Sequence, residues 1–125
     1  ARRYRDALAA GPLLLCRGEA LSYADREGGF WGRHPRSVVG ITRRGEAVMI
    51  VVDGRFPGKA AGMTIGELIY LVRQLGLYSA LNLDGGGSST LWCEEAGVVN
   101  RPSDNRRFDH EGERRVTNCI AVVAE

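Results

Sequence analysis

Ser37-Val-Val-Gly-Ile-Thr42 and Ala47-Val-Met-Ile-Val-Val-Asp53 are two strand-like runs separated by the turn Arg43-Arg-Gly-Glu46. Runs rich in β-branched residues on either side of a glycine-containing turn predict a β-hairpin. The second run is apolar without interruption, which is typical of a central strand covered on both faces. The hairpin is therefore expected to lie within a sheet, with its second strand in the interior.

A helix is predicted after the hairpin. Thr64 and Glu67 form a T-x-x-E capping box, which is typical of a helix start. Apolar residues then recur at helical spacing as far as Gly76, namely Ile65, Leu68, Ile69, Val72 and Leu75. Residues 80–84 follow as a short strand. Strand, helix and strand in sequence predict a βαβ unit whose two strands are parallel and whose crossover is right-handed.

The remaining elements are shorter. Strands are predicted at residues 13–16, 89–93 and 116–123, the end of a helix at residues 4–10, and a long loop at residues 21–36. Because the predicted hairpin is antiparallel and the βαβ unit parallel, the sheet is expected to be mixed. The predicted fold class is α+β, a mixed α/β layered domain with one main helix at about residues 64–75 packed on the sheet.

The composition describes one globular domain over residues 1–125. The hydrophobic fraction is 44% and the charged fraction 26%, which is ordinary for a globular domain of this length. The net charge is only +2, and acidic residues interrupt the basic ones between positions 101 and 115, which disfavours a nucleic-acid partner. No apolar run approaches the roughly 18 residues of a membrane span, and no signal-peptide pattern follows the first residues.

Cys16, Cys93 and Cys119 lack the C-x-x-C spacing of a metal site, and an odd number does not suit a disulfide framework. Buried free thiols are expected, because an isolated cysteine commonly behaves as a small hydrophobic residue. A bridge between Cys93 and Cys119 remains the alternative.

Two carboxylates follow strand ends. Asp53 and Asp84 each come directly before a glycine, at the carboxyl ends of the two strands of the βαβ unit. Ligands bind at that edge of open sheets, so the two carboxylates could form an acid–base or nucleophile pair in one cleft. Asp53-Gly54 is equally typical of a simple turn.

Gly85-Gly-Gly87, followed by Ser88-Ser-Thr90, exceeds what a hairpin turn requires. Such a loop can offer backbone N–H groups and hydroxyls to an oxyanion or a phosphate. No lysine follows the last glycine, so the loop is not a nucleotide-binding P-loop.

A series of motifs occurs in one order along the chain: Asp53-Gly-Arg55, Gly62-Met-Thr-Ile-Gly-Glu-Leu68, Leu81-Asn-Leu-Asp-Gly-Gly-Gly-Ser-Ser-Thr90, Val99-Asn-Arg-Pro-Ser-Asp104 and Glu113-Arg-Arg-Val-Thr-Asn118. From about residue 7 to residue 123 the sequence resembles the phosphodiester glycosidase family, which includes bacterial proteins linked to exopolysaccharide. The resemblance implies a hydrolase that cleaves a glycosyl-phosphodiester or related glycan linkage. It also implies a carbohydrate or sugar-phosphate substrate and an extracytoplasmic or secreted location.

The resemblance implies a pocket with named roles. Asp84 is expected to be the nucleophile or general base at the anomeric carbon, with Glu113 or Asp53 as the partner acid. Arg36 and Arg55 are expected to hold the phosphate. The other implied substrate-binding residues are Gly85, Gly86, Gly87, Ser88, Ser89, Asn100, Ser103, Asp104 and Arg114. Surface ion pairs are the alternative for Arg55 and Arg114, and His34, which precedes a proline, is expected to position backbone.

Two other functions remain open. One is a non-catalytic module that binds saccharide or phosphate. The other is a metal-dependent phosphodiesterase in which Asp53, Asp84 and Asp104 bind Ca²⁺ or Mg²⁺; otherwise no cofactor is expected. Nothing before residue 7 matches the family's Asn- and Phe-containing motif. The chain is therefore expected to be the carboxyl-terminal portion of the domain, completed by another segment or subunit.

Overall fold

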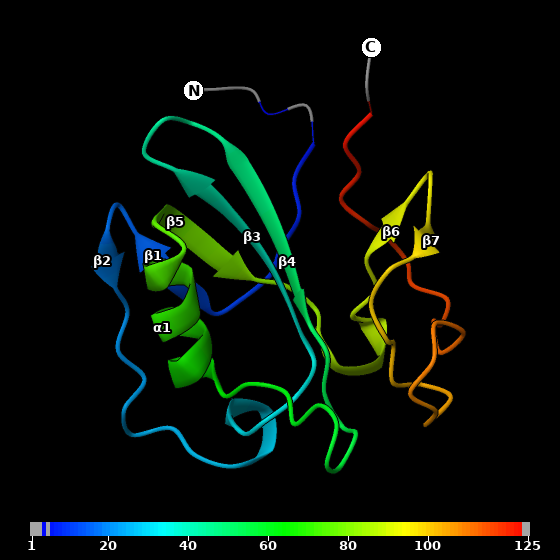
Figure 1. Cartoon of the computed structure of the whole chain (residues 1–125). Helices are drawn as coiled ribbons and strands as arrows, with labels where there is room; N and C mark the ends of the chain where they lie inside the picture. The colour runs from blue at the N-terminus through cyan, green and yellow to red at the C-terminus, as the bar shows by residue number, and fades with distance from the viewer. Residues whose placement is uncertain (1–3, 5, 124–125) are drawn as a thin grey trace.

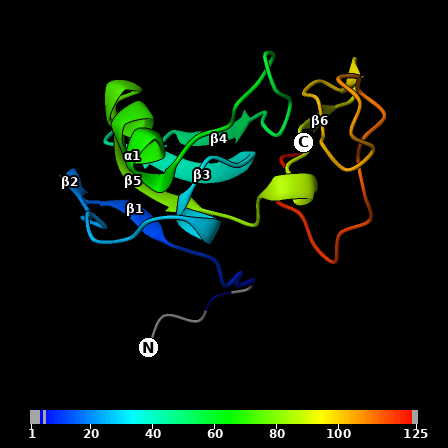
Figure 2. The same ribbon diagram turned by 90° about the horizontal axis from the view of Figure 1, so that it is seen from below.

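The computed structural model describes residues 4 and 6–123. It consists of a five-stranded sheet with one α-helix on it, and an arm of mostly irregular chain, residues 89–123, that carries a two-stranded sheet. In Figure 1 the arm lies to the right of the main sheet, and Figure 2 shows the helix on one face of that sheet. No helix in the described part is long and apolar enough to cross a membrane.

The main sheet is built from β1 (Leu13–Cys16), β2 (Glu19–Ala20), β3 (Arg36–Thr42), β4 (Ala47–Val52) and β5 (Leu77–Asn82). The strand order is β2-β1-β5-β3-β4, and all neighbouring pairs are antiparallel. β4 and β5 are both antiparallel to β3, which lies between them, so they run in the same direction. The ends of β4 and β5 therefore lie at one end of the sheet.

The α+β class is confirmed, but two predictions about the sheet are wrong. β4 and β5, the two strands of the predicted βαβ unit, are separated by β3. The described sheet therefore contains no parallel pair, and the prediction of a mixed sheet is wrong. β4 is an edge strand among the described residues, although its unbroken apolar run predicted an interior strand. The reason is that β5 pairs with the far side of β3, which leaves the outer side of β4 without a partner strand there.

The predicted helix is confirmed as α1 (Ile65–Gln74). The Thr64 hydroxyl accepts a hydrogen bond of 3.1 Å from the Glu67 N–H, and the Glu67 carboxylate accepts one of 2.9 Å from the Thr64 N–H. This capping box satisfies two N–H groups that the first turn leaves unpaired. The chain leaves the helix through Gly76 at φ +73°, a left-handed conformation that favours glycine.

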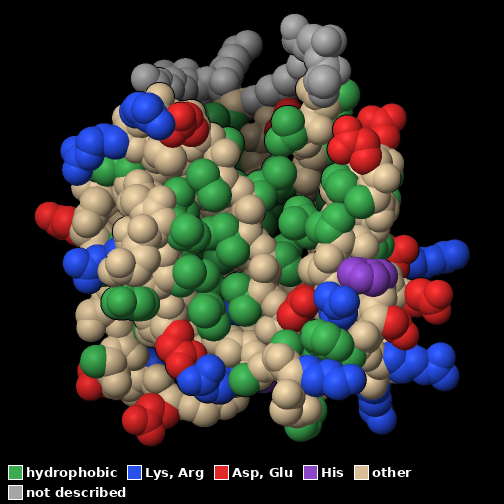
Figure 3. Space-filling model, viewed as in Figure 1, with side chains coloured by type: hydrophobic (Ala, Val, Ile, Leu, Met, Phe, Trp, Pro, Cys, Tyr) green, Lys and Arg blue, Asp and Glu red, His purple; other side chains and the backbone are tan. Residues whose placement is uncertain are grey.

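The core lies between α1 and the β1–β5 half of the sheet. Its buried residues are Leu14, Leu15, Val38, Ile65, Leu68, Val72, Leu77 and Ala80. Burial of each large aliphatic side chain contributes about 1.5–3 kcal/mol. Because α1 packs on β1 and β5, the helix-side residues of β4, Val48, Ile50 and Val52, are only half-buried. Figure 3 shows hydrophobic side chains gathered on this face, over the sheet and toward the arm.

Several shorter predictions are wrong. Residues 4 and 6–10 are not helical, and residues 116–123 form no strand. In that last segment Val116 and Val122 are 50% and 77% exposed, so the apolar run has no neighbouring strand to pair with in the described part. The predicted strand at 89–93 shrinks to β6 (Trp92–Cys93), which pairs with β7 (Gly97–Val98). The predicted loop at residues 21–36 contains a single 3₁₀ turn, η1 (Gly29–Trp31).

All three cysteines are free thiols. Cys93 is half-buried, but Cys16 and Cys119 are exposed, contrary to the expectation of buried thiols. Cys16 lies at the end of β1 beside the exposed β2, and Cys119 lies in the irregular end of the arm, where no second layer covers it.

Candidate functional site

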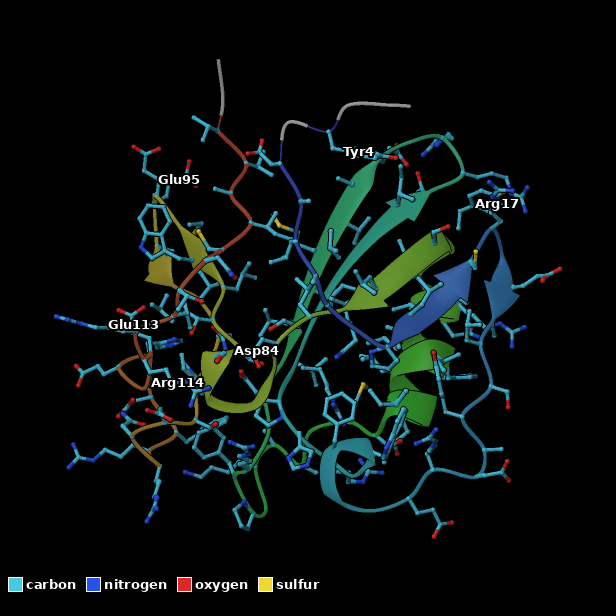
Figure 4. All side chains as sticks on the ribbon, turned by 180° about the vertical axis from the view of Figure 1, so that it is seen from behind. Tyr4, Arg17, Asp84, Glu95, Glu113 and Arg114 are labelled. Atoms are coloured by element: carbon cyan, nitrogen blue, oxygen red, sulfur yellow. The ribbon has the colours of Figure 1, made fainter. Side chains whose placement is uncertain are left out.

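The candidate site is built on the turn that follows β5. Asp84 lies two residues beyond the strand and leads into the 3₁₀ turn η2 (Gly86–Ser88). Its side chain is exposed, and one carboxylate oxygen accepts a hydrogen bond of 2.9 Å from the neighbouring Gly85 N–H. No other described residue donates to this carboxylate or forms an ion pair with it. Figure 4 shows Asp84 and Arg114 on opposite sides of the η2 turn.

The backbone of this turn is less available for an anion than the glycine-rich sequence predicted. The N–H groups of Gly85, Gly86, Ser88 and Ser89 all donate within the protein, to Asp84, Pro35, Gly85 and Gly86 respectively. Of residues 85–89, only Gly87 has an N–H with no acceptor among the described residues. A substrate that binds here can use the Gly87 N–H and must otherwise use side chains.

Arg55 is the first of those side chains. Its backbone has φ +67°, a left-handed conformation that costs a non-glycine residue of order 1–3 kcal/mol. Its guanidinium lies against Gly86, where an added Cβ would come within 2.8 Å of Nη2. Within the described part Arg55 forms no ion pair, and its hydrogen-bond contact is with His34 Nδ1 at 3.5 Å. Most of its N–H donors therefore remain available for a ligand.

Arg114 lies on the other side of η2 and is already engaged. It donates to the Ser88 hydroxyl from Nη2 at 2.6 Å and from Nε at 3.2 Å. Nη1 is 3.6 Å from Asp104 Oδ1, so the alternative of an ion pair is confirmed for Arg114. An added Cβ at Gly87 would lie 2.5 Å from Asp104 Oδ1, which shows how closely the arm packs on the turn.

Asp53, expected to be a catalytic carboxylate, holds the arm against the sheet. Its Oδ1 accepts hydrogen bonds of 3.0 Å from Asn100 Nδ2 and from the Arg101 N–H, and its Oδ2 accepts one of 3.1 Å from the Arg101 N–H. Asn100 also donates to the Ser89 carbonyl and accepts from the Leu91 N–H. Asp53 and Asn100 therefore join the end of β4 to the chain that follows η2.

We expect Asp53→Ala to loosen the arm, because it leaves the Asn100 amide and the Arg101 N–H without their acceptor. The loss should be about 2–3 kcal/mol of unfolding free energy, typical of a partly buried charged acceptor. Limited proteolysis should show earlier cleavage between positions 94 and 111. Asp53→Asn keeps one acceptor oxygen and should cost less. Equal protease resistance of Asp53→Ala and the unaltered protein would contradict the role of Asp53 in holding the arm.

Arg36 does not take the position expected of a phosphate ligand. It is 2% exposed, and its guanidinium donates to the carbonyls of Phe30, Gly32 and Met63. Burial lowers the pKa of Arg36 below its usual value. The sequence showed only an arginine at the start of a strand, whereas the fold turns its side chain inward, where three backbone carbonyls and the face of the Phe30 ring surround it. Its role is structural.

Three other expected residues are not brought to the turn as ligands. Glu113 is exposed, makes no hydrogen bond or ion pair with a described residue, and points outward from the arm in Figure 4. Ser89 is buried, and its hydroxyl is bonded to that of Ser37 at 3.2 Å. Ser103 is also buried, at 7% exposed, and its hydroxyl has no partner among the described residues.

The comparisons with known proteins agree with this architecture. The family model of the phosphodiester glycosidases matches residues 1–123. The chain belongs to this family. A mouse protein named N-acetylglucosamine-1-phosphodiester alpha-N-acetylglucosaminidase is 33% identical over 70 residues, which are 56% of this chain and 13% of that protein. The SPbeta prophage-derived protein YomE of Bacillus subtilis is 38% identical over 72 residues, 58% of this chain and 11% of that one.

Solved structures extend the likeness to the fold of the chain. A hypothetical protein from Synechocystis matches with a TM-score of 0.67 and 28% identity, over 87% of this chain and 19% of that chain. The catalytic domain of zebrafish N-acetylglucosamine-1-phosphodiester alpha-N-acetylglucosaminidase, auto-inhibited by its pro-peptide, matches with a TM-score of 0.63 and 23% identity, over 77% and 34% of the two chains. The chain thus spans 11–16% of the length of the curated relatives that it matches.

Two contacts near the candidate site were not predicted from sequence. His34 reaches Arg55 through its ring, and Phe56 packs edge to face on Phe108 with ring centroids 5.1 Å apart. Lys59 and Arg101 also lie over the Phe108 ring, at 5.2 Å and 4.6 Å. His34 and Arg55, and Phe56 and Phe108, are far apart in the chain and show no periodic pattern, so no local signal could have paired them.

The candidate site is open to solvent, since the Asp84 and Arg55 side chains are both exposed. Two cavities, of about 560 Å³ and 220 Å³, lie elsewhere, the first beside the start of α1 and the second beside Arg43 and Arg73. Within the part of the chain that the structure describes, no group of three or more His, Cys, Asp or Glu side chains is arranged to hold a metal ion. The proposed triad of Asp53, Asp84 and Asp104 is therefore not assembled as a ligand set, and binding of a divalent cation stays a prediction.

Proposed function

We propose that this chain carries the reaction centre of a hydrolase that cleaves a glycosyl-phosphodiester between the anomeric carbon and the phosphate oxygen. One observation carries the proposal. The exposed Asp84 carboxylate and the Arg55 guanidinium, which has no acidic partner in the described part, both lie at one glycine turn, beside Gly85 and Gly86 respectively. A carboxylate for the anomeric carbon and a guanidinium for the phosphate are the two groups that this reaction needs.

The roles follow from the reaction. Asp84 either attacks the anomeric carbon, forming a glycosyl ester that water then hydrolyses, or takes a proton from the attacking water. In either route the bond from that carbon to the phosphate oxygen breaks with its electron pair staying on oxygen. The phosphate thereby changes from a diester with one negative charge to a monoester that approaches two. Arg55 stabilises the charge that develops, which lowers the barrier more than it strengthens substrate binding.

A phosphomonoester is a good leaving group, because its second pKa is near 6. Departure of such a group needs little help from a general acid. This chemistry fits a site in which Asp53 is engaged by Asn100 and Arg101, and in which the Asp104 carboxylate, packed against Gly87, is paired with Arg114. Arg114 contributes by holding Ser88 and the arm in place.

The names of the relatives suggest which substrate class to test. Because the mouse relative is named for an N-acetylglucosamine-1-phosphodiester, that sugar is the first to test. The resemblance to a family with exopolysaccharide-linked bacterial members supports placing the protein outside the cytoplasm or in the secreted fraction.

The test uses N-acetylglucosamine 1-phosphate esterified to 4-nitrophenol and the whole protein that contains this chain. Cleavage at the anomeric carbon releases N-acetylglucosamine and 4-nitrophenyl phosphate, so yellow nitrophenol forms only after a phosphatase is added. Immediate release of nitrophenol, sensitive to EDTA, would identify a metal-dependent phosphodiesterase instead. Saturable binding without turnover would identify a non-catalytic binding module. Either result would overturn the proposal.

A further inference from the structure

The backbone of His34 is fixed from two sides. Its N–H and C=O bond those of Met63 in an isolated antiparallel bridge, at 3.3 Å and 3.0 Å. An added Cβ at Gly62 would lie 2.5 Å from the carbonyl carbon and oxygen of His34, and one at Gly54 would lie 3.0 Å from the same carbon. Two glycines therefore let the β4–α1 connection close tightly on the His34 backbone, which fixes the position from which the imidazole ring projects.

The ring contacts define one tautomer. Nε2 lies 2.7 Å from the Gly29 carbonyl oxygen, and a carbonyl only accepts, so Nε2 carries the hydrogen. In the neutral ring Nδ1 then presents a lone pair. Arg55 Nη2 is 3.5 Å from Nδ1, and a guanidinium only donates. The Nε2–H form thus satisfies both neighbours at once, which the other tautomer cannot do.

Arg55 otherwise has little to hold its side chain. It is exposed and forms no ion pair in the described part of the chain, and an arginine loses considerable rotamer freedom when it is ordered. The acceptor on His34 is therefore the contact that favours a guanidinium orientation against Gly86, two residues after Asp84.

We propose that His34 is a positioning residue whose Nε2–H tautomer orients Arg55 for the phosphate of the substrate. This inference rests on the proposed function for the role of Arg55 and adds the residue that sets its direction. It differs from the expectation for His34 drawn from sequence, which concerned only the backbone. His34 itself touches no reacting atom.

Two amide variants separate the contacts of the ring. His34→Asn places a side-chain oxygen near the position of Nδ1 and keeps an acceptor for Arg55. His34→Gln places its amide near Nε2, so it keeps a donor to Gly29 and loses the acceptor for Arg55. We expect His34→Gln to lower kcat/KM roughly tenfold, whereas His34→Asn should fall at most about threefold. The reverse order, or equal losses in both variants, would overturn the proposal.

Two measurements do not depend on turnover. In long-range ¹H–¹⁵N spectra at pH 8, His34 should show the Nε2–H tautomer, and the Nδ1–H tautomer would overturn the proposal. Dimethyl phosphate, a diester that keeps one charge at this pH, should bind about fivefold more weakly to His34→Gln than to His34→Asn. Equal binding would mean that His34 does not orient Arg55. If these two results hold and no substrate is turned over, the proposed function fails and the positioning role stands.

Discussion

Asp84→Asn is expected to lower kcat/KM for the sugar phosphodiester by about a hundredfold or more. Asparagine keeps the size of aspartate and can still accept a hydrogen bond from the Gly85 N–H, but it can act neither as nucleophile nor as base. Because the carboxylate is exposed and has only this local contact, its replacement should leave the melting temperature within about 2 °C. Turnover and thermal unfolding are measured on the same preparation.

Glu95→Gln is the matched control, since it makes the same acid-to-amide change at another exposed carboxylate. Glu95 lies at the tip of the β6–β7 hairpin, away from Asp84 in Figure 4. The control should retain both activity and stability. An active but destabilised Asp84→Asn protein would show that Asp84 only supports the glycine turn, and the catalytic role would have to be abandoned.

Gly62→Ala should produce the largest loss of stability among the variants proposed for this chain. Gly62 has φ +82°, and an added Cβ would lie 2.5 Å from two backbone atoms of His34, which cannot move without breaking the bridge to Met63. The strain of the left-handed conformation and the backbone clash together should cost about 3 kcal/mol or more. Urea unfolding monitored by circular dichroism measures this loss.

Gly58→Ala provides the comparison, because Gly58 has a similar φ of +72° but nothing lies within 4 Å of an added Cβ. Only the conformational term applies there, at about 1 kcal/mol. The difference between the two variants isolates the close approach of Gly62 to His34. If both variants lost the same stability, the connection between β4 and α1 would be looser than the structure shows.

The hairpin and α1 were predictable because their signals are local. Two runs of β-branched and apolar residues on either side of a glycine-containing turn define β3 and β4. Thr64, Glu67 and the apolar spacing define the helix within about a dozen residues. The glycine string after β5 identified the position of the candidate site for the same reason. Its unusual composition is readable without knowledge of any distant contact, and so is the family resemblance that the motifs carry.

The order of the strands and the state of each side chain depend on contacts between distant residues. Pairing of β5 with β3 places β4 at the edge, although the apolar run of β4 predicted the interior. Tertiary packing also turns Arg36 inward, where it donates to three backbone carbonyls. It brings Asn100, 47 positions away, to donate a hydrogen bond to the Asp53 carboxylate. It also leaves Arg55 without an ion pair in the described part. Residue type and spacing show which groups can ionise, but only the tertiary structure decides which of them are already neutralised or hydrogen-bonded.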